Sequence, residues 1–313
     1  MIQYPAKAMI ELSRACNLRC PVCPVGNGSA RMYPPMPFEL FRHIIDQAGA
    51  FVQELLVHNF GEPLLHPQIV ECIAYAKEKG IKQVKMHTNG LLLSPAIAAG
   101  LVRAGLDKLK VSLDGLDQAT YEQYRRGGDF NTLIQNISRL REIRERLGMS
   151  RPIIQAQYIV MRHNEERISE FEVFAKRIGA DQIKFKTFNA LLSGEKGSSE
   201  GRSMIPGDFR LQRYTDGDAT NIRAEYVLPH CTWPWDCLVV IADGTIVPCC
   251  YDFNGEYRLG TVSNERFRSW WATPERKAFR RRVRSAMRTI PICSRCPVGI
   301  PDLGIPEKDI ADS

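Results

Sequence analysis

Short apolar runs alternate with amphipathic stretches along the first 190 residues of the chain. The runs that predict buried strands cover residues 7–12, 54–60, 81–88, 106–114, 152–161 and 181–188. Apolar residues at helical spacing predict helices over residues 37–49, 67–79, 95–105, 117–124, 130–147 and 166–179. Strands that alternate with helices in this way form parallel β-α units. Six such units predict an α/β fold built as a partial (β/α)6 barrel.

The pattern changes after residue 190. Residues 191–208 are rich in Gly and Ser and have no apolar period, which predicts a linker or a loop over a site. From about residue 226 the chain consists of short strands, turns and cysteines, and the ADG sequence at 242–244 predicts a hairpin turn. We therefore expect four regions: a barrel core over 1–190, a linker or active-site loop over 191–225, a small cysteine-rich domain over 226–300 and a tail over 301–313.

The composition is that of an ordinary globular protein, with 44% hydrophobic and 25% charged residues among 313. No apolar run approaches the roughly 18 residues of a membrane span, and the start of the chain does not resemble a secretory signal. We therefore expect a cytoplasmic protein with no membrane partner. The net charge is +7, and much of the excess lies in residues 276–288. That run could bind nucleic acid, but a solvated helix face is the simpler interpretation, so we do not expect a nucleic-acid partner.

The ten cysteines are unevenly distributed. Three lie within residues 16–23, four within 231–250 and two within 293–296, whereas Cys72 stands alone on a helical pattern. We expect Cys72 to be a small core residue. A long chain without a signal does not favour a disulfide scaffold, so the clustered thiols indicate metal or redox chemistry.

The first cluster, Cys16, Cys20 and Cys23, has the spacing C-x3-C-x2-C and follows the first predicted strand. Three thiolates are one short of a closed zinc site or an ordinary four-iron cluster, so one metal position would stay open to a non-protein ligand. A structural zinc loop is the alternative, but no fourth ligand lies nearby in the sequence. Three further motifs stand at predicted strand ends, where ligands bind in such folds: NFGEP at 59–63, HTNG at 87–90 and VSLDG at 111–115.

Taken together, these motifs resemble those of the radical S-adenosylmethionine (radical SAM) superfamily. The resemblance implies that the three cysteines hold a [4Fe-4S] cluster whose open iron binds S-adenosyl-L-methionine (SAM). Reductive cleavage of SAM would then give a 5′-deoxyadenosyl radical that abstracts hydrogen from a substrate. The implied SAM or substrate contacts are Gly61, Glu62, Asn89, Ser112 and Asp114. Two positions depart from the family pattern: Phe60 replaces a glycine, and Val22 replaces the usual aromatic residue before the third cysteine.

The second set of cysteines resembles the shortened SPASM, or twitch, extension of radical SAM enzymes. That extension spaces a cysteine, a glycine and a second cysteine as Cys231, Gly244 and Cys249 are spaced here. The resemblance implies one auxiliary [4Fe-4S] cluster, bound by Cys231, Cys249, Cys293 and Cys296. A four-cysteine zinc ribbon is the alternative. Cys237 and Cys250 are left over, and the sequence assigns Cys237 no role.

Cys250 suggests the reaction. Neighbouring side chains on an extended segment point to opposite sides, so Cys250 is expected to face away from the cluster bound by Cys249. A thiol there could return a hydrogen atom to a substrate radical, which gives epimerisation. The alternatives are dehydrogenation of an alcohol to a ketone through the auxiliary cluster and modification of a ribosomal peptide. The layout resembles that of members that act on aminoglycosides and cyclitols, such as the epimerase of neomycin and the cyclitol dehydrogenase of butirosin biosynthesis.

Such a reaction needs a small-molecule substrate and a reducing partner, for which we expect a flavodoxin or a ferredoxin. A polycationic aminoglycoside would require carboxylates, and Asp114, Asp252 and Glu256 are the candidates. The positive net charge of the chain opposes that substrate. Two pairs of polar residues on strands face either the barrel interior or the helices: Gln155 with Gln157, and Lys184 with Lys186.

Overall fold

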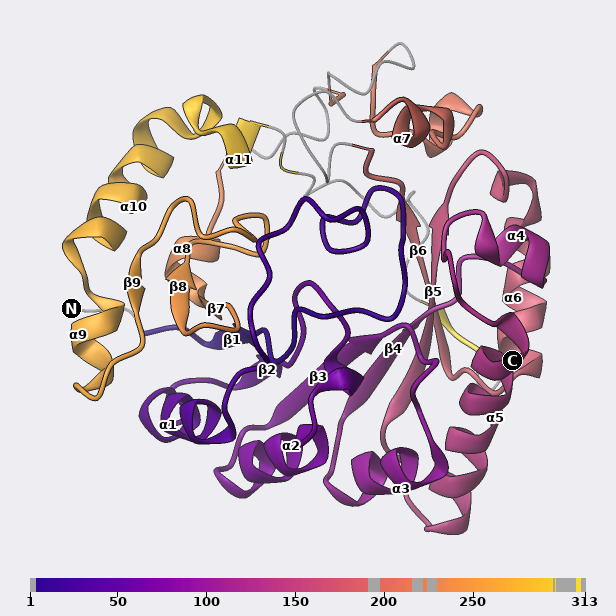
Figure 1. Cartoon of the computed structure of the whole chain (residues 1–313), viewed down its shortest axis with the longest axis horizontal. Coiled ribbons are helices and arrows are strands. Elements are labelled where there is room, and N and C mark those ends of the chain that lie inside the picture. The colour runs from indigo at the N-terminus through magenta and orange to yellow at the C-terminus, as the bar shows by residue number, and fades with distance from the viewer. Residues whose placement is uncertain are drawn as a thin grey trace.

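The computed structural model describes residues 4–190, 198–215, 222–223, 230–294, 296 and 308–310. Parts of the predicted linker and most of the predicted tail lie outside these residues, so the expected region boundaries stay predictions. A ten-stranded sheet has the order β10-β6-β5-β4-β3-β2-β1-β7-β8-β9. Figure 1 shows that its strands curve into an open arc, with the loop that follows β1 (indigo) lying across the centre.

All six predicted barrel strands are confirmed, and they pair in parallel in chain order. They are β1 (Lys7–Ile10), β2 (Glu54–Leu56), β3 (Gln83–Thr88), β4 (Lys108–Ser112), β5 (Ile153–Val160) and β6 (Gln182–Thr187). The strands are shorter than the apolar runs that predicted them. The partial α/β barrel predicted from the sequence is therefore confirmed.

The six predicted helices are confirmed as well, and they lie on the outer side of the arc (Figure 1). They are α1 (Phe38–Ala48), α2 (Ile69–Glu78), α3 (Pro95–Arg103), α4 (Gln118–Glu122), α5 (Phe130–Arg146) and α6 (Ile168–Arg177). Side-chain caps define several of their starts: Ser94 accepts a hydrogen bond from Ile97 N, and Asp129 accepts one from Thr132 N. Single 3-10 turns, η1 (Pro63–Leu65) and η2 (Glu165–Arg167), occur in two of the connecting loops.

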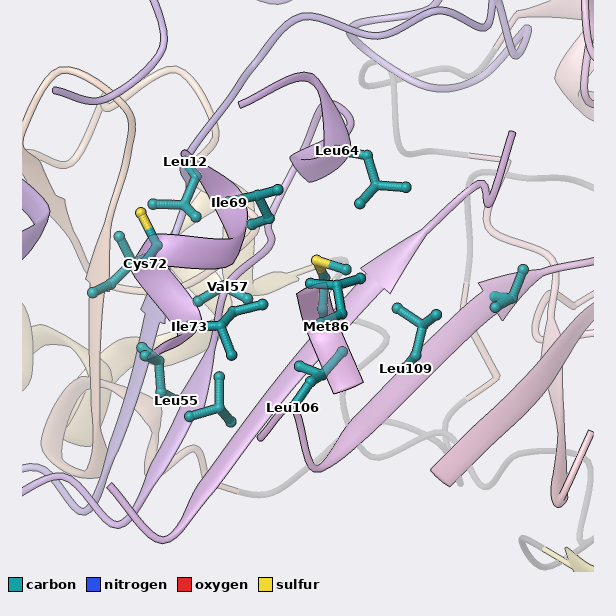
Figure 2. Close-up of a cluster of buried hydrophobic side chains, with 14 of the residues drawn as sticks. Leu12, Leu55, Val57, Leu64, Ile69, Cys72, Ile73, Met86, Leu106 and Leu109 are labelled. Carbon is teal, nitrogen blue, oxygen red and sulfur yellow. The ribbon is translucent and has the colours of Figure 1, made fainter. Parts of the chain in front are cut away.

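The main hydrophobic core fills the space between the strands and these helices. Alternate strand residues such as Leu55, Met86 and Leu109 point outward into it and share the cluster with Ile73 of α2 (Figure 2). Cys72 lies in the same cluster and is fully buried, which confirms that it is a core residue. The other alternate strand residues face the inside of the arc, and the candidate site is built from them.

The C-terminal part of the chain continues the same sheet. Its elements are α7 (Ser199–Ser203), η3 (Phe209–Leu211), α8 (Trp233–Asp236), β7 (Cys237–Val240), β8 (Thr245–Val247), β9 (Gly260–Thr261), α9 (Phe267–Trp271), α10 (Pro274–Ala286), η5 (Met287–Thr289), α11 (Pro291–Ser294) and β10 (Lys308–Asp309). The predicted hairpin is confirmed as β7 and β8, with Gly244 at a φ of 84° in the turn. The sequence did not indicate that β7 pairs in parallel with β1, so the cysteine-rich region extends the barrel sheet.

The basic run at 276–288 forms most of α10, but it is not a uniformly solvated helix face. Arg276 is fully buried, with its guanidinium carbon 3.8 Å from the centre of the Trp271 ring. Helix α10 presents one face to the main core, where Phe279 and Val283 are also buried, and Arg276 lies on that face. The interpretation as a solvated face is therefore wrong for this residue. In the described ranges, none of the helices combines the length and the apolar character needed to cross a membrane.

Candidate functional site

A cavity of about 210 Å³ opens at the C-terminal ends of the barrel strands. The cavity, called here the barrel pocket, brings together residues from the β1 loop and from the ends of β2, β3, β4 and β5. Its lining includes Cys16, Cys20, Cys23, His58, Gly61, Glu62, His87, Asn89, Ser112, Tyr124, Arg125, Gln157 and Ile159. The three thiols of the first cluster and four of the five predicted cofactor contacts therefore converge here, and Asp114 is the exception.

The loop after β1 folds tightly around its cysteines. Cys20 is buried, and a Cβ at Gly26 would lie only 2.6 Å from the Cys20 backbone nitrogen, so the close approach requires glycine. The backbone N–H of Leu18 donates to Cys16 Sγ at 3.4 Å. Burial raises the pKa of Cys16 to about 11, which means that a bound metal must displace the thiol proton.

Glu62 is held by three donors at the end of β2. Its Oε1 accepts hydrogen bonds from Thr88 Oγ1 at 2.6 Å and from Leu64 N at 3.1 Å, and its Oε2 accepts one from Asn89 N at 2.8 Å. Burial raises the pKa of this carboxyl group above its usual value. The preceding Gly61 has a φ of 78°, and a Cβ there would collide with the Ser13 carbonyl. The NFGEP sequence therefore fixes a carboxylate in the pocket wall.

Asp114 does not line the barrel pocket. Its carboxylate is fully buried, accepts a hydrogen bond from Ile159 N at 2.6 Å and forms an ion pair with Arg125, whose Nε lies 2.6 Å away. Arg125 does line the pocket, and its Nη1 lies 3.7 Å from Cys20 Sγ. Burial opposes the charge of Arg125, but Asp114 and then Cys20 raise its pKa well above the usual value. The Asp114 carboxylate therefore contacts Arg125 and not the cavity, and its predicted contact with SAM or substrate stays a prediction.

Sequence reasoning missed Arg125 and two histidines of the pocket. His58 precedes NFGEP and His87 begins HTNG, so the same strand-end rule would have found both. His87 Nε2 lies 2.9 Å from Ser112 Oγ. Burial, followed by the charges of Lys110 and Lys186, lowers the pKa of His58 to about 3. Both rings are therefore neutral near pH 7, since the same influences lower the pKa of His87.

A second cavity, the auxiliary cavity, lies between α8, α10, α11 and the segment after β8. Five thiols line it, belonging to Cys231, Cys249, Cys250, Cys293 and Cys296. The four cysteines of the predicted auxiliary set are thus brought together, and Cys250 joins them. Burial raises the pKa of Cys250 to about 12. Cys237 is not part of this lining but is buried on β7.

Cys250 contacts a different set of residues from Cys231 and Cys293 of the auxiliary cavity. It packs against an apolar cluster on the inside of the arc that contains Met9, Cys237 and Val239. Cys231 and Cys293 instead pack against the main core. Cys250 therefore borders both the auxiliary cavity and the inner face of the barrel. Because it shares the cavity with Cys249, the expectation that it faces away from the Cys249 site is not borne out.

Asp252 was considered as a carboxylate for a cationic substrate, but the structure gives it another task. Its Oδ1 accepts a hydrogen bond from Glu256 N at 2.8 Å, and its Oδ2 accepts one from Tyr257 N at 2.9 Å. The side chain is buried and closes the loop that follows Cys250. With Asp114 engaged by Arg125, two of the three candidate carboxylates are already occupied.

The arrangement of the thiols suits clusters better than single ions. Across the described residues, no three His, Cys, Asp or Glu side chains converge closely enough to hold one metal ion. A four-iron cluster spreads its cysteine sulfurs farther apart, because each sulfur binds a different iron. Thiols placed around a cavity fit that requirement: three at the barrel pocket, with room for a further ligand, and at least four at the auxiliary cavity.

Comparisons with known proteins agree with this geometry. The curated relatives include an AdoMet-dependent heme synthase of Methanosarcina barkeri, 29% identical over 210 residues, which are 67% of this chain and 57% of the relative. A tungsten-containing aldehyde ferredoxin oxidoreductase cofactor-modifying protein of Pyrococcus furiosus is 24% identical over 261 residues, 80% of this chain and 72% of that protein. The chain thus spans little more than half the length of the first of these relatives.

Two solved structures share the fold. BtrN in complex with AdoMet and 2-DOIA has a TM-score of 0.58 at 17% identity, covering 94% of this chain and 93% of BtrN. Streptococcus suis SuiB bound to its precursor peptide SuiA has a TM-score of 0.67 at 15% identity, covering 89% of this chain and 67% of SuiB. At such identities the likeness extends to the fold alone.

Two family profiles match the chain, one over the residues of each cavity. The profile described as the radical SAM superfamily matches residues 10–173, which contain the barrel pocket, and the SPASM iron-sulfur cluster-binding domain matches residues 231–297, which contain the auxiliary cavity. Together they imply SAM and two [4Fe-4S] clusters as cofactors. With more than half of its length matched by the first profile, the chain belongs to the radical SAM superfamily and carries a C-terminal SPASM domain.

Proposed function

We propose that this enzyme epimerises a carbon centre of a carbohydrate-like small molecule and that Cys250 is the hydrogen-atom donor. The single observation that carries this proposal is the position of Cys250, which lines the auxiliary cavity yet packs with the inner-face residues Met9 and Val239. When bound, SAM and its cluster supply a carbon radical that removes a hydrogen atom from the substrate. The residues of the chain then decide which reaction the substrate radical undergoes.

The barrel pocket orients SAM in this proposal. Cys16, Cys20 and Cys23 hold the first cluster, and Glu62 accepts the SAM ammonium group in a charge-assisted contact. Its three backbone and hydroxyl donors leave Glu62 little freedom to rotate. Arg125, fixed by Asp114, adds a positive charge beside Cys20.

Cys250 acts on the substrate radical from the other side. The S–H bond breaks and a C–H bond forms, which leaves an inverted carbon and a thiyl radical on Cys250. One electron and one proton restore the thiol, and we propose that a flavodoxin or ferredoxin supplies the electron. The auxiliary thiols Cys231, Cys249, Cys293 and Cys296 would hold the second cluster beside Cys250, and such a cluster would supply one-electron redox chemistry there.

The second candidate is dehydrogenation of an alcohol to a ketone. It is favoured by the fact that Cys250 lines the auxiliary cavity with the other four thiols, so it could serve that cavity alone. The substrate radical would then lose its second electron towards the auxiliary site, and no hydrogen atom would return to carbon.

Deuterium labelling separates the two reactions. The anaerobically reconstituted enzyme is incubated in deuterated water with SAM, a reductant and a panel of sugars and cyclitols. An inverted product with one deuterium on carbon supports epimerisation, whereas a ketone without deuterium supports dehydrogenation. Cys250→Ala is expected to keep its iron content and SAM cleavage but to stop inversion. Cys237→Ala, which removes another thiol of the same apolar cluster, is the matched control and should still invert the substrate.

Inversion with deuterium incorporation by the Cys250→Ala variant would refute the donor role.

A further inference from the structure

The solvent-facing side of α10 carries a row of exposed cations. Lys277, Arg281 and Arg284 of α10 are exposed, and so is Arg288 in the η5 turn that follows it. The three helix residues are four and three positions apart, a spacing that places them on one face of the helix. The whole of α10 contains six basic residues but a single carboxylate, Glu275, in its first turn. The four exposed cations are called here the α10 stripe.

The stripe keeps its charge within the part of the chain that the structure describes. No carboxylate there forms an ion pair with any of its four side chains, and none of the four has a further polar partner. Glu275 stands two positions before Lys277, a spacing at which helix side chains do not face each other. Arg284 lies over the Trp235 ring, with its guanidinium carbon 5.1 Å from the ring centre, and this contact leaves its charge in place. The stripe is therefore a surface of positive potential.

The other face of α10 lines the auxiliary cavity. Phe279 and Val283 belong to that lining, as does Met287 of η5. Cys293, another lining residue, stands on α11, which comes after η5 near the edge of the molecule (Figure 1). A helix with its side chains is about 10–12 Å across. A protein seated on the stripe would therefore lie about one helix diameter from the cavity that gathers the auxiliary thiols and Cys250.

We infer that the α10 stripe is the docking surface of an acidic one-electron carrier protein. The inference rests on the proposed function, because that reaction leaves a thiyl radical on Cys250. The carrier loses one electron, and the thiyl radical gains this electron together with a proton and becomes a thiol again. Opposite charges on two protein surfaces accelerate their encounter and orient the complex. A cationic surface directly over the auxiliary cavity would bring an acidic carrier to the side where the electron is needed.

Nucleic acid is the other polyanion that a basic helix could bind. Proteins that bind single strands regardless of sequence combine positive charge with aromatic rings on which the bases stack. Phe279 is the one aromatic residue in the α10 sequence, and it is buried. Trp271 is fully buried too, beneath the guanidinium of Arg276. The stripe offers charge without a stacking surface, which favours an acidic protein.

Binding of purified carriers tests this inference. Biolayer interferometry under anaerobic conditions measures the affinity of the immobilised, reconstituted enzyme for an acidic flavodoxin and for an acidic ferredoxin. Lys277→Gln, Arg281→Gln and Arg288→Gln are combined in one stripe variant, and Arg284 is kept because it contacts Trp235. The stripe variant should bind the tighter of the two carriers at least about tenfold more weakly, because three attractive charges are lost. Its affinity should also depend less steeply on salt than that of the wild-type enzyme.

A control variant loses the same number of charges elsewhere. Lys82→Gln, Arg103→Gln and Arg146→Gln remove exposed cations that precede β3 or end α3 and α5, away from α10 (Figure 1). This variant should change the affinity by less than about twofold, because exposed charges beyond about 10 Å are screened. Equal losses in the two variants, or no binding of either carrier by the wild-type enzyme, would overturn the inference. Tighter binding of a single-stranded RNA than of both carriers, lost in the stripe variant alone, would assign the stripe to nucleic acid and overturn it as well.

Two reductants separate docking from folding. Dithionite is a small reductant that needs no docking surface, so with dithionite the stripe variant should produce 5′-deoxyadenosine as fast as the wild-type enzyme. With the reduced carrier at low salt, bleaching of the visible absorbance should be about tenfold slower in the stripe variant, in line with its weaker binding. A wild-type rate of bleaching would contradict the docking surface.

The inference and the proposed function fail in different ways. Cys250→Ala should bind the carrier with wild-type affinity even though it no longer inverts a substrate. If Cys250→Ala still inverts, the donor role fails while the docking surface stands. If the stripe variant binds the carrier as tightly as the wild-type enzyme, the docking surface fails while the donor role stands.

Discussion

The ion pair between Asp114 and Arg125 allows a quantitative test of how the barrel pocket is built. The Asp114 side chain has no exposed surface, and only 13% of the Arg125 side chain is exposed. Asp114→Asn keeps an oxygen that accepts the hydrogen bond from Ile159 N, so the backbone contact survives. The substitution removes the carboxylate charge and leaves the buried guanidinium without its partner.

Removing one member of a buried pair costs about 3–5 kcal/mol, because the remaining charge is desolvated without compensation. The full cost is expected in the cluster-free protein, where burial raises the pKa of Cys20 and keeps it a neutral thiol. Once a cluster is bound, the Cys20 thiolate, 3.7 Å from Arg125 Nη1, offsets part of that cost. The destabilisation should therefore be smaller in the cluster-bound enzyme.

Urea unfolding followed by tryptophan fluorescence measures the effect in the anaerobic, cluster-free protein. A double-mutant cycle with Asp114→Asn and Arg125→Met isolates the interaction from the individual substitutions. The loss of unfolding free energy in the double variant should be smaller than the sum of the two single losses by at least about 2 kcal/mol, because the double variant leaves no buried charge unpaired. A loss below about 1 kcal/mol for Asp114→Asn, or additive losses, would refute the reasoning.

Three further expectations concern the clusters, pH and the buried arginine. Cys249→Ser should lower the iron content by the four irons of one cluster, whereas Cys250→Ala should leave it unchanged. Iron analysis and visible absorbance measure both variants, and an equal loss of iron in the two would contradict this expectation. The pKa of His58 is about 3 in the folded protein and about 6.5 in the unfolded chain. The free energy of unfolding should therefore be constant above about pH 6.5. Below that pH, this group should lower it by about 1.4 kcal/mol for each pH unit. His58→Gln should remove that slope in urea titrations at pH 7 and pH 5.5, and an unchanged slope would contradict the assignment. Arg276 donates to Pro234 O at 3.1 Å, yet its Nε and Nη2 are buried without a described partner. Arg276→Met should therefore change the unfolding free energy by less than about 1 kcal/mol. Arg276→Ala should lower it by about 3 kcal/mol, because it leaves a cavity. A loss in Arg276→Met as large as that in Arg276→Ala would show that the charge of Arg276 itself stabilises the fold.

Periodicity was sufficient to predict the barrel because its elements depend on local patterns. The strands and helices follow from apolar spacing, and Cys72 follows from its place on the buried face of α2. The thiols of each predicted set meet at one cavity, as the family resemblance implied, and their role as cluster ligands stays a prediction. The addition of β7 to β1 could not be predicted, because it depends on which edge of the sheet stays free after the barrel strands have paired.

Side-chain direction was the harder part of the site. Alternation shows that Gln155 and Gln157 share a face and that Lys184 and Lys186 share a face, but it does not say which face is inside. The structure settles it through Ile154 and Ile183, which are buried in the main core and leave the polar residues inside. Similarly, Asp114 stands at a strand end as expected. Its carboxylate pairs with Arg125, eleven residues later in the sequence, and does not face the cavity.

The shared sheet explains how two distant sets of cysteines can serve one reaction. β1 leads into the loop of the first cluster, and β7 begins the hairpin that ends at Cys249 and Cys250; the two strands pair along their full length. Glu11, directly after β1, is fully buried and accepts hydrogen bonds from Arg14, from Phe60 N and from Ala242 N in the hairpin turn. Backbone pairing and this one carboxylate therefore connect the hairpin that leads to Cys250 with the strand that leads to the barrel pocket. In the proposed epimerisation, a substrate between the barrel pocket and Cys250 would meet SAM on one side and Cys250 on the other, as inversion at one carbon requires.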